Sequence, residues 1–167
     1  DRDDPMSSRY LNILCVRLVF CLYAEDAGVF GRHDMFHDYM AHYETEDMRM
    51  ALIRLFEELN TPPEKRSKYD KPMLAAFPYT NGGLFAEEID IPQFTDELRD
   101  TLLQHASLDF DWSEISPTIF GGVFESTLNP ETRRSGGMHY TSIENIHKVI
   151  DPLFYNDLRT AFEDCLE

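Results

Sequence analysis

The feature that most constrains the fold is an apolar run near the start of the chain, from Leu11 to Ala24, which is broken only by Asn12 and Arg17. Apolar side chains fall on nearly every face of a helix drawn through this run, which predicts a helix buried at the centre of a helical bundle. Gly28 and Gly31 are expected to end that helix, because glycine tolerates left-handed backbone. The run has 14 residues, whereas about 18 to 20 are needed to cross a bilayer. We therefore predict no association with a membrane.

A second helix is predicted between Glu44 and Leu59, because apolar residues recur there with the 3.6-residue period of a helix that buries one face. The residues expected to face the core are Met48, Ala51, Leu52, Leu55, Phe56 and Leu59, and those expected to face water are Glu46, Asp47, Arg49, Glu57 and Glu58.

Several shorter helices complete the predicted bundle. They cover residues 33–44, a segment capped by Thr95 that runs to His105, residues 113–128 with Pro117 in the first turn, residues 143–154, and the chain after Pro152. The dipeptide Asn81-Gly82 is typical of a tight hairpin turn. The predicted fold class is therefore all-α, a helical bundle of about six to eight helices with at most one small β-hairpin.

The charge of the chain is strongly negative, with 15 Lys and Arg residues against 31 Asp and Glu residues and a net charge of −16. Such a surface repels a phosphate backbone, so contact with nucleic acid is expected to come from other parts of a larger protein. Residues 84–114 alone carry a net −8. The segment 64–72 has a net +2 and is interpreted as a solvated connection.

The cysteines and the termini indicate the setting of the chain. Cys15, Cys21 and Cys165 are an odd number and show no CxxC spacing. The two within the apolar run are predicted to be buried thiols, which suits a reducing, cytoplasmic location. The chain begins "DRDDP" and ends in what reads as a helix, so we expect it to be a piece of a larger protein.

Catalytic and metal-binding arrangements are largely missing from the sequence. His33, His37 and His42 lie near Asp34 and Asp38, a spacing that could hold zinc on a helix face. No Cys or Glu motif completes such a site, and ordinary surface histidines are the favoured interpretation. The chain also lacks the G-x-S-x-G elbow, the GxxxxGK[ST] loop and the GxGxxG fingerprint. We predict no catalytic residue and no metal site.

The stretch "RRSGGMHYTS", residues 133–142, leads into a helix whose Thr141 and Glu144 have the spacing of a capping box. Glycines in such a loop allow close approach of the backbone, and the exposed N–H groups of a helix N-terminus suit an anion. An ordinary loop and cap would show the same pattern, so chemistry alone leaves both interpretations open.

Residues 118–154 resemble the segment just ahead of the catalytic domain in adenine-N6 DNA methyltransferases. That family includes the type I modification subunits and large single-chain type II restriction–modification enzymes. Upstream, "FPYTNGGLF" with "IDIPQF" is similar to the helical spacer of the MmeI-like group. The family pattern, FG-x-x-(Y/F)-E-x-x-L and then R-x-x-x-G-x-(Y/H)-(Y/F)-T-(P/S), is matched by Phe120, Gly121, Phe124, Glu125, Leu128, Arg133 or Arg134, Gly137, His139, Tyr140, Thr141 and Ser142.

The resemblance implies a helical spacer at residues 1–116 and the truncated start of a methyltransferase domain at 117–167. It also implies S-adenosylmethionine as the cofactor of the full-length protein, with double-stranded DNA bound through other domains and the methyltransferase core adjoining this chain. The glycine-rich cofactor motif and the Asn-Pro-Pro-aromatic motif of the family are absent here, so the fragment alone is expected to be inactive. The residues implied to contribute to the cofactor pocket are Gly137, His139, Tyr140, Thr141 and Ser142.

Two other interpretations remain open at this point. The chain could be an acidic all-α module that binds a protein partner or mimics the charge of DNA, which the −8 segment would favour. It could also be a small independent enzyme that uses the histidine cluster. Arg133 and Arg134 could contact DNA phosphates or the carboxylate of the cofactor, or pair with nearby acidic side chains.

Overall fold

The structure is a computed structural model, and it describes residues 5–69, 71–80, 83–117 and 119–121, together with the single positions 148, 151, 159 and 162. The chain divides into two compact units, Asp1–Ile115 and Ser116–Glu167. The first unit is described in nearly all its length. Of the second, the described positions between 117 and 121 are helical.

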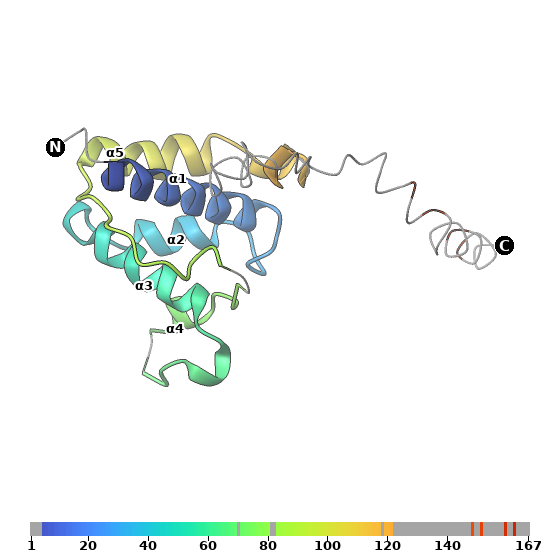
Figure 1. The fold of residues 1–167 in the computed structure, drawn as a ribbon, viewed down its shortest axis with the longest axis horizontal. Coiled ribbons are helices and arrows are strands. Elements are labelled where there is room, and N and C mark those ends of the chain that lie inside the picture. Colours follow the sequence, from blue (N-terminus) through green and yellow to red (C-terminus); the bar gives the residue numbers. More distant parts are fainter. Residues whose placement is uncertain are drawn as a thin grey trace. The chain divides into compact units, whose positions relative to one another are not determined.

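The first unit is built from helices joined by irregular segments (Figure 1). No strand occurs among the residues described, and the predicted hairpin turn at positions 81–82 lies outside them. The all-α class is confirmed. In chain order the elements are α1 (Pro5–Asp26), α2 (Met35–Ala41), the 3₁₀ turn η1 (Thr45–Asp47), α3 (Met48–Asn60), η2 (Pro63–Lys65), α4 (Pro72–Ala75), α5 (Asp96–Asp100), the π-helix η3 (Thr101–Leu108) and η4 (Trp112–Glu114).

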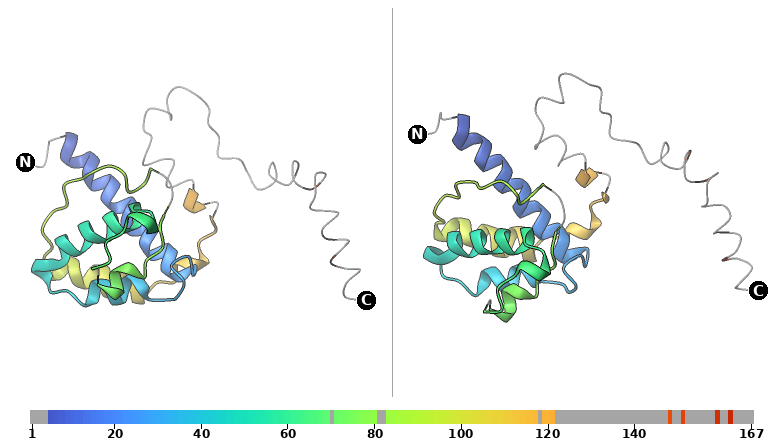
Figure 2. Two further views of the ribbon diagram at one scale, coloured as in Figure 1. Left: turned by 90° about the horizontal axis from the view of Figure 1, so that it is seen from below. Right: turned by 60° about the horizontal axis from the view of Figure 1, so that its bottom comes forward.

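The core of this unit forms where α1, α3 and η3 surround α2 (Figures 1 and 2). Phe36 and Met40 of α2 are fully buried, as are Leu52 and Leu55 of α3. Each such side chain contributes roughly 1.5–3 kcal/mol of transfer free energy. The amphipathic pattern of residues 44–59 is confirmed, since all six residues predicted to face the core are buried.

The predicted burial is wrong at three positions. Leu11 is 52% exposed and Cys15 is also exposed, so the first half of α1 has a solvent face and only Cys21 of these two cysteines is buried. Glu58, predicted to face water, is 5% exposed. Its register explains the burial, because it stands three residues after Leu55 and next to Leu59 on the inward stripe of α3.

Two glycines reverse the chain after α1, as predicted. Gly28 has φ +73° and Gly31 has φ +96°, conformations that side-chain-bearing residues adopt only at a cost. The amide of Val29 donates to the carbonyl of Ala24 at 2.8 Å, which closes the end of the helix. After this turn the chain continues into α2, which packs against α1.

The last helix of the unit begins where the sequence predicted. The Thr95 hydroxyl accepts a hydrogen bond from the amide of Leu98 at 3.2 Å and so caps α5. The helix continues beyond the predicted end at His105, because its final eight residues adopt the π form and reach Leu108. Leu102 and Leu103 of η3 are buried.

Candidate functional site

The predicted cofactor residues Gly137, His139, Tyr140, Thr141 and Ser142 lie outside the described part of the chain, which stops at 121 and resumes at 148. Their role stays a prediction, and the same is true of the capping box. The candidate functional geometry of the described residues belongs to the first unit. It consists of the irregular segment 84–95, a charged groove beside α3, and one buried carboxylate.

The segment 84–95, which begins with the last two residues of "NGGLF", is irregular in structure and runs past α1 and α3 to the start of α5 (Figures 1 and 2). Arg17 of α1 holds its first part, donating from Nε to the Leu84 carbonyl at 2.8 Å and from Nη2 to the Glu87 carbonyl at 2.6 Å. The guanidinium carbon lies 5.2 Å from the ring centre of Phe56 and 5.6 Å from that of Phe85, within the range of a cation–π contact. Arg17 is only 2% exposed, so these contacts are desolvated.

A second arginine holds the next part of the same segment. Arg49 of α3 donates from Nε to the Ile91 carbonyl at 2.6 Å, and its Nη2 lies 3.1 Å from a carboxylate oxygen of Asp90. On the solvent side, Arg9 of α1 pairs with the carboxylate of Glu87. An irregular backbone has no ladder of its own, so its buried carbonyls need other donors. Here the helices supply them.

A charged groove lies beside α3 and is lined by residues of α3, of the segment 61–69 that follows it, and of the start of α4. The groove has a volume of about 520 Å³. Arg66 forms its inner wall, donating from Nε to the Thr61 carbonyl at 2.9 Å and from Nη1 to the Phe77 carbonyl at 2.7 Å. Arg66 Nη1 also lies 2.9 Å from Oε1 of Glu58, an ion pair whose side chains are 12% and 6% exposed. The interpretation of residues 64–72 as a merely solvated connection is therefore wrong for Arg66, which is structural.

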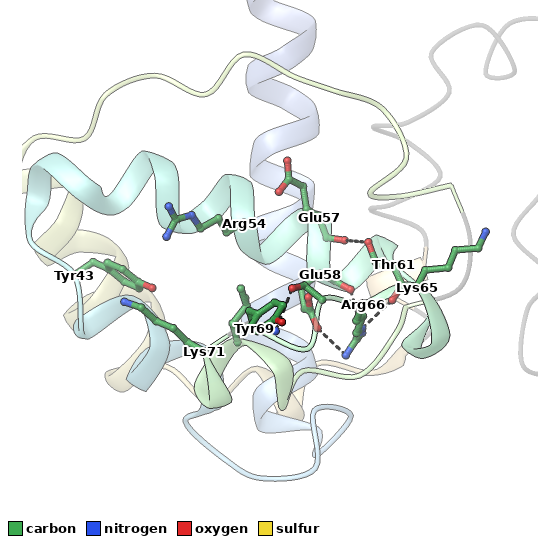
Figure 3. A pocket seen from close by; sticks show the side chains of 11 residues that line it. Tyr43, Arg54, Glu57, Glu58, Thr61, Lys65, Arg66, Tyr69 and Lys71 are labelled. Carbon is green, nitrogen blue, oxygen red and sulfur yellow. Dashed lines mark hydrogen bonds and ion pairs between the residues drawn. The ribbon is translucent and has the colours of Figure 1, made fainter.

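The remaining cations of the groove face outward. Figure 3 shows Arg54, Tyr43 and Lys71 around one end and Lys65 extending from the other. The ammonium of Lys71 lies 5.6 Å from the Tyr43 ring centre. Tyr69, between these ends, is 97% exposed. The arrangement is an open, cation-rimmed groove with one solvent-facing aromatic ring.

The buried carboxylate belongs to Glu25, near the end of α1. Its Oε2 accepts from the amides of Phe36 and His37 at 2.9 Å each, and its Oε1 accepts from the Ser107 hydroxyl at 3.0 Å. One carboxylate thus joins α1, the first turn of α2 and η3. Burial raises the pKa of Glu25, and these hydrogen bonds together offset part of that rise. The group therefore serves as an internal cap rather than as a surface charge.

His33, His37 and His42, the candidate zinc ligands, all lie in the described part of the chain. No group of three or more His, Cys, Asp or Glu side chains is arranged to hold a metal ion within the part of the chain that the structure describes. His37 lies 3.7 Å from a carboxylate oxygen of Asp38, and Asp38 pairs with Arg32 at 2.7 Å. Nor is any described helix long and apolar enough to cross a membrane.

Arg17, Glu25 and Glu58 were not singled out by the sequence as organising residues. Each is a charged residue that falls within an apolar helical stripe, and that position was the available signal. What the sequence did not reveal is the partner, which lies in a segment without periodicity for Arg17 and Glu58 and on other helices for Glu25. Arg17 pairs with carbonyls 67 and 70 positions away.

Comparison with known proteins places these features in a family. Residues 9–85 match the family described as "MmeI, helicase spacer domain". Over 162 residues, 96% of this chain, the sequence is 35% identical to DNA methyltransferase A of Bacillus subtilis (strain 168), and it spans 18% of that protein. A solved structure of the type IIL restriction–modification enzyme MmeI in complex with DNA matches with a TM-score of 0.60 and 44% sequence identity, covering 93% of this chain and 21% of that one.

The all-α fold and these likenesses define the class: this is a spacer region associated with restriction–modification methyltransferases. The resemblance to the MmeI-like group seen in the sequence is confirmed. Residues 9–85 belong to the MmeI helicase spacer domain family. The matched segment contains both Arg17 and Phe85, so the cation–π contact between them is formed within the family domain.

Proposed function

We propose that this chain is the helical spacer, residues 1–116, and the start of the methyltransferase domain, residues 117–167, of an S-adenosylmethionine-dependent DNA adenine-N6 methyltransferase from a restriction–modification system. The observation that carries the proposal is the 35% identity to a DNA methyltransferase over 96% of the chain. That alignment is far longer than the family domain at 9–85, so it requires similarity in the second unit as well.

In this proposal the second unit contributes part of the cofactor pocket. S-adenosylmethionine supplies an activated methyl group on its sulfonium. Tyr140, Thr141 and Ser142 face the amino-acid end of the cofactor, and the helix N-terminus that they begin receives its carboxylate. Gly137 allows the backbone to approach closely, and His139 completes the matched motif. Base recognition and methyl transfer belong to parts of the protein beyond this chain.

The test uses the full-length protein that contains these residues. Methylation of double-stranded DNA is measured by mass spectrometry of the released nucleosides, with N6-methyladenine as the expected product. Tyr140→Ala and Thr141→Ala are expected to weaken S-adenosylmethionine binding about tenfold or more in calorimetric titration, because hydrogen bonds to a charged group are lost. Cys15→Ser, on the exposed face of α1, is the control and should leave the affinity unchanged. An unmodified adenine, or unchanged cofactor affinity in both variants, contradicts the proposal.

The alternative of an acidic interaction module has less support. Within residues 84–114, several carboxylates make internal contacts rather than forming a free acidic face. Glu87 pairs with Arg9 and Asp90 with Arg49, while Asp109 accepts a hydrogen bond from Gln104. The Asp111 carboxylate accepts from the amide of Ser113 at 2.9 Å.

A further inference from the structure

Most of the described cations of the first unit make internal contacts, and the few that instead face solvent are gathered at one place. Four arginines and lysines have no ion pair and no hydrogen bond to a carbonyl within the described residues: Arg54, Lys65, Lys68 and Lys71. Arg54, Lys65 and Lys71 line the groove beside α3, and Lys68 lies between its lining residues Ser67 and Tyr69. The other described cations of this unit make internal contacts; they are Arg9, Arg17, Arg32, Arg49, Arg66 and Arg99.

From this distribution we propose that the groove beside α3 binds phosphates of the DNA backbone. The inference rests on the proposed function, in which the parent protein works on DNA. It adds a contact on the spacer itself, which the strongly acidic overall charge had argued against. Net charge describes the whole chain, but a phosphate responds to charges within about a Debye length, roughly 8–10 Å.

The local charge of the groove is positive although carboxylates are present. Its lining residues include four cations and two carboxylates. One of the two carboxylates, that of Glu58, is neutralised by Arg66 at 2.9 Å, which leaves Glu57 as the acidic residue of the lining that opposes the lining's outward cations. A concave surface lined by one sign of charge focuses the field and attracts the opposite sign. Holding unpaired cations together is unfavourable unless an anion joins them.

The spread of the cations favours a row of phosphates over a small anion. A compact anion site needs donors that converge on one point. Arg66, the most buried cation of the groove, already donates to four carbonyls, those of Glu58, Thr61, Ala75 and Phe77. Of the free cations, Arg54 and Lys71 instead lie at one end of the groove and Lys65 at the other (Figure 3). Lysines act as point charges on flexible stems, a suitable arrangement for backbone contacts that carry no base specificity.

The experiment measures the salt dependence of DNA binding by the full-length protein and by its Lys65→Gln/Lys68→Gln variant. Each lost phosphate contact reduces the slope of log K against log salt by roughly 0.9 on duplex DNA, so two contacts reduce it by roughly 1.8. Between 50 and 200 mM KCl the affinity of the variant should therefore fall about 12-fold less than that of the parent. The change should be the same on a specific and on a random duplex, because backbone contacts do not read sequence.

The matched control is Arg9→Gln/Arg32→Gln, which removes the same charge at exposed positions outside the groove. Its slope should equal that of the parent. The inference is overturned if the slope of the Lys65→Gln/Lys68→Gln variant is unchanged, or if the control changes the slope equally. It is also overturned if polyglutamate, an acidic polypeptide, binds the groove without affecting DNA binding. Adenine methylation by the unmodified protein at low salt is read in parallel. If it is absent, the proposed function fails; if it is present while the slope is unchanged, only the groove assignment fails.

Discussion

Replacing Arg17 by alanine should detach the segment 84–95 from α1. The guanidinium of Arg17 is the donor to two backbone carbonyls in that segment, those of Leu84 and Glu87. It also lies against the rings of Phe56 and Phe85, whose centres are 5.4 Å apart. Alanine leaves both carbonyls without this donor and leaves the two rings without this cation–π contact.

The magnitude follows from the two hydrogen bonds made by the charged group, each worth about 1.5–3 kcal/mol. Two effects offset part of their sum. A groove of about 400 Å³ lined by Arg17 and Glu87 lets water reach the freed carbonyls, and alanine carries no desolvation penalty, whereas burial lowers the pKa of Arg17. The free energy of unfolding should therefore fall by about 3 kcal/mol, near the lower end of the sum.

Urea denaturation of the 167-residue chain, followed by tryptophan fluorescence, measures this loss. Trp112 is the single tryptophan of the sequence. Its indole donates to the Ala106 carbonyl and its amide to the Asp26 carboxylate, at 2.7 Å each, so its emission reports whether η4 stays on α1. With a slope of about 1–3 kcal/mol per molar urea, the midpoint should fall by about 1 to 3 M at unchanged slope.

Arg9 provides a matched control on the same helix. It pairs with the side chain of Glu87, whose backbone Arg17 holds, but the two paired side chains are 54% and 41% exposed. Solvent screens such a pair, so Arg9→Ala should shift the midpoint little. Arg17→Lys should fall between Arg17→Ala and the parent, because an ammonium lacks the planar fork that reaches two carbonyls. Equal shifts for Arg17→Ala and Arg9→Ala would refute the reasoning.

Two further predictions concern buried groups. Because burial raises the pKa of Glu25 above its usual 4.5, the native state binds this proton more tightly than the unfolded chain does. The resulting stabilisation is complete below pH 4.5 and is lost as pH rises through the native pKa. Glu25→Gln should remove this pH dependence. In urea titrations the free energy of unfolding of the variant, relative to that of the parent, should therefore rise as the pH rises from 4.5 through the native pKa. A difference between the two proteins that does not change with pH contradicts the assignment. Peptide mapping after maleimide treatment of the native chain should show rapid labelling of Cys15, which is exposed, and protection of Cys21, which is fully buried and whose pKa is raised by burial. Equal labelling rates would contradict the placement of the two thiols.

The helices could be predicted from the sequence because their signals are local. The stripe from Met48 to Leu59 needs only the 3.6-residue period, and the cap at Thr95 needs only its neighbours. The solvent face of α1 at Leu11 and Cys15 could not be predicted in this way. An apolar run indicates that burial of the helix is favourable, but tertiary packing decides which of its faces other elements cover.

The candidate site likewise has one part that local sequence patterns predict and another that depends on long-range contacts. The family motifs at residues 81–85 and 133–142 are short sequence patterns, and their detection needs no partner. The groove depends on long-range contacts that no local pattern encodes. Glu58 and Arg66 are separated by the end of α3 and a proline-containing loop, and their pairing brings the basic segment under the helix. Because Arg66 is buried in these contacts, the other cations of the groove can be recognised as the ones that face solvent.

Buried charges in this spacer act mainly on backbone rather than on other side chains. Arg17 and Arg66 donate to carbonyls of irregular segments, and Glu25 accepts from amides at the start of α2. A helix satisfies its own interior backbone groups, whereas segments such as 83–95 and 61–69 cannot. Apolar residues in place of these charges would leave buried carbonyls and amides unpaired, at a cost of about 1–3 kcal/mol each. The charged interruptions of the apolar stripes are therefore what allows long irregular segments to take a defined path across the helices, and both residues 83–85 of "NGGLF" and part of the basic groove lie on such segments.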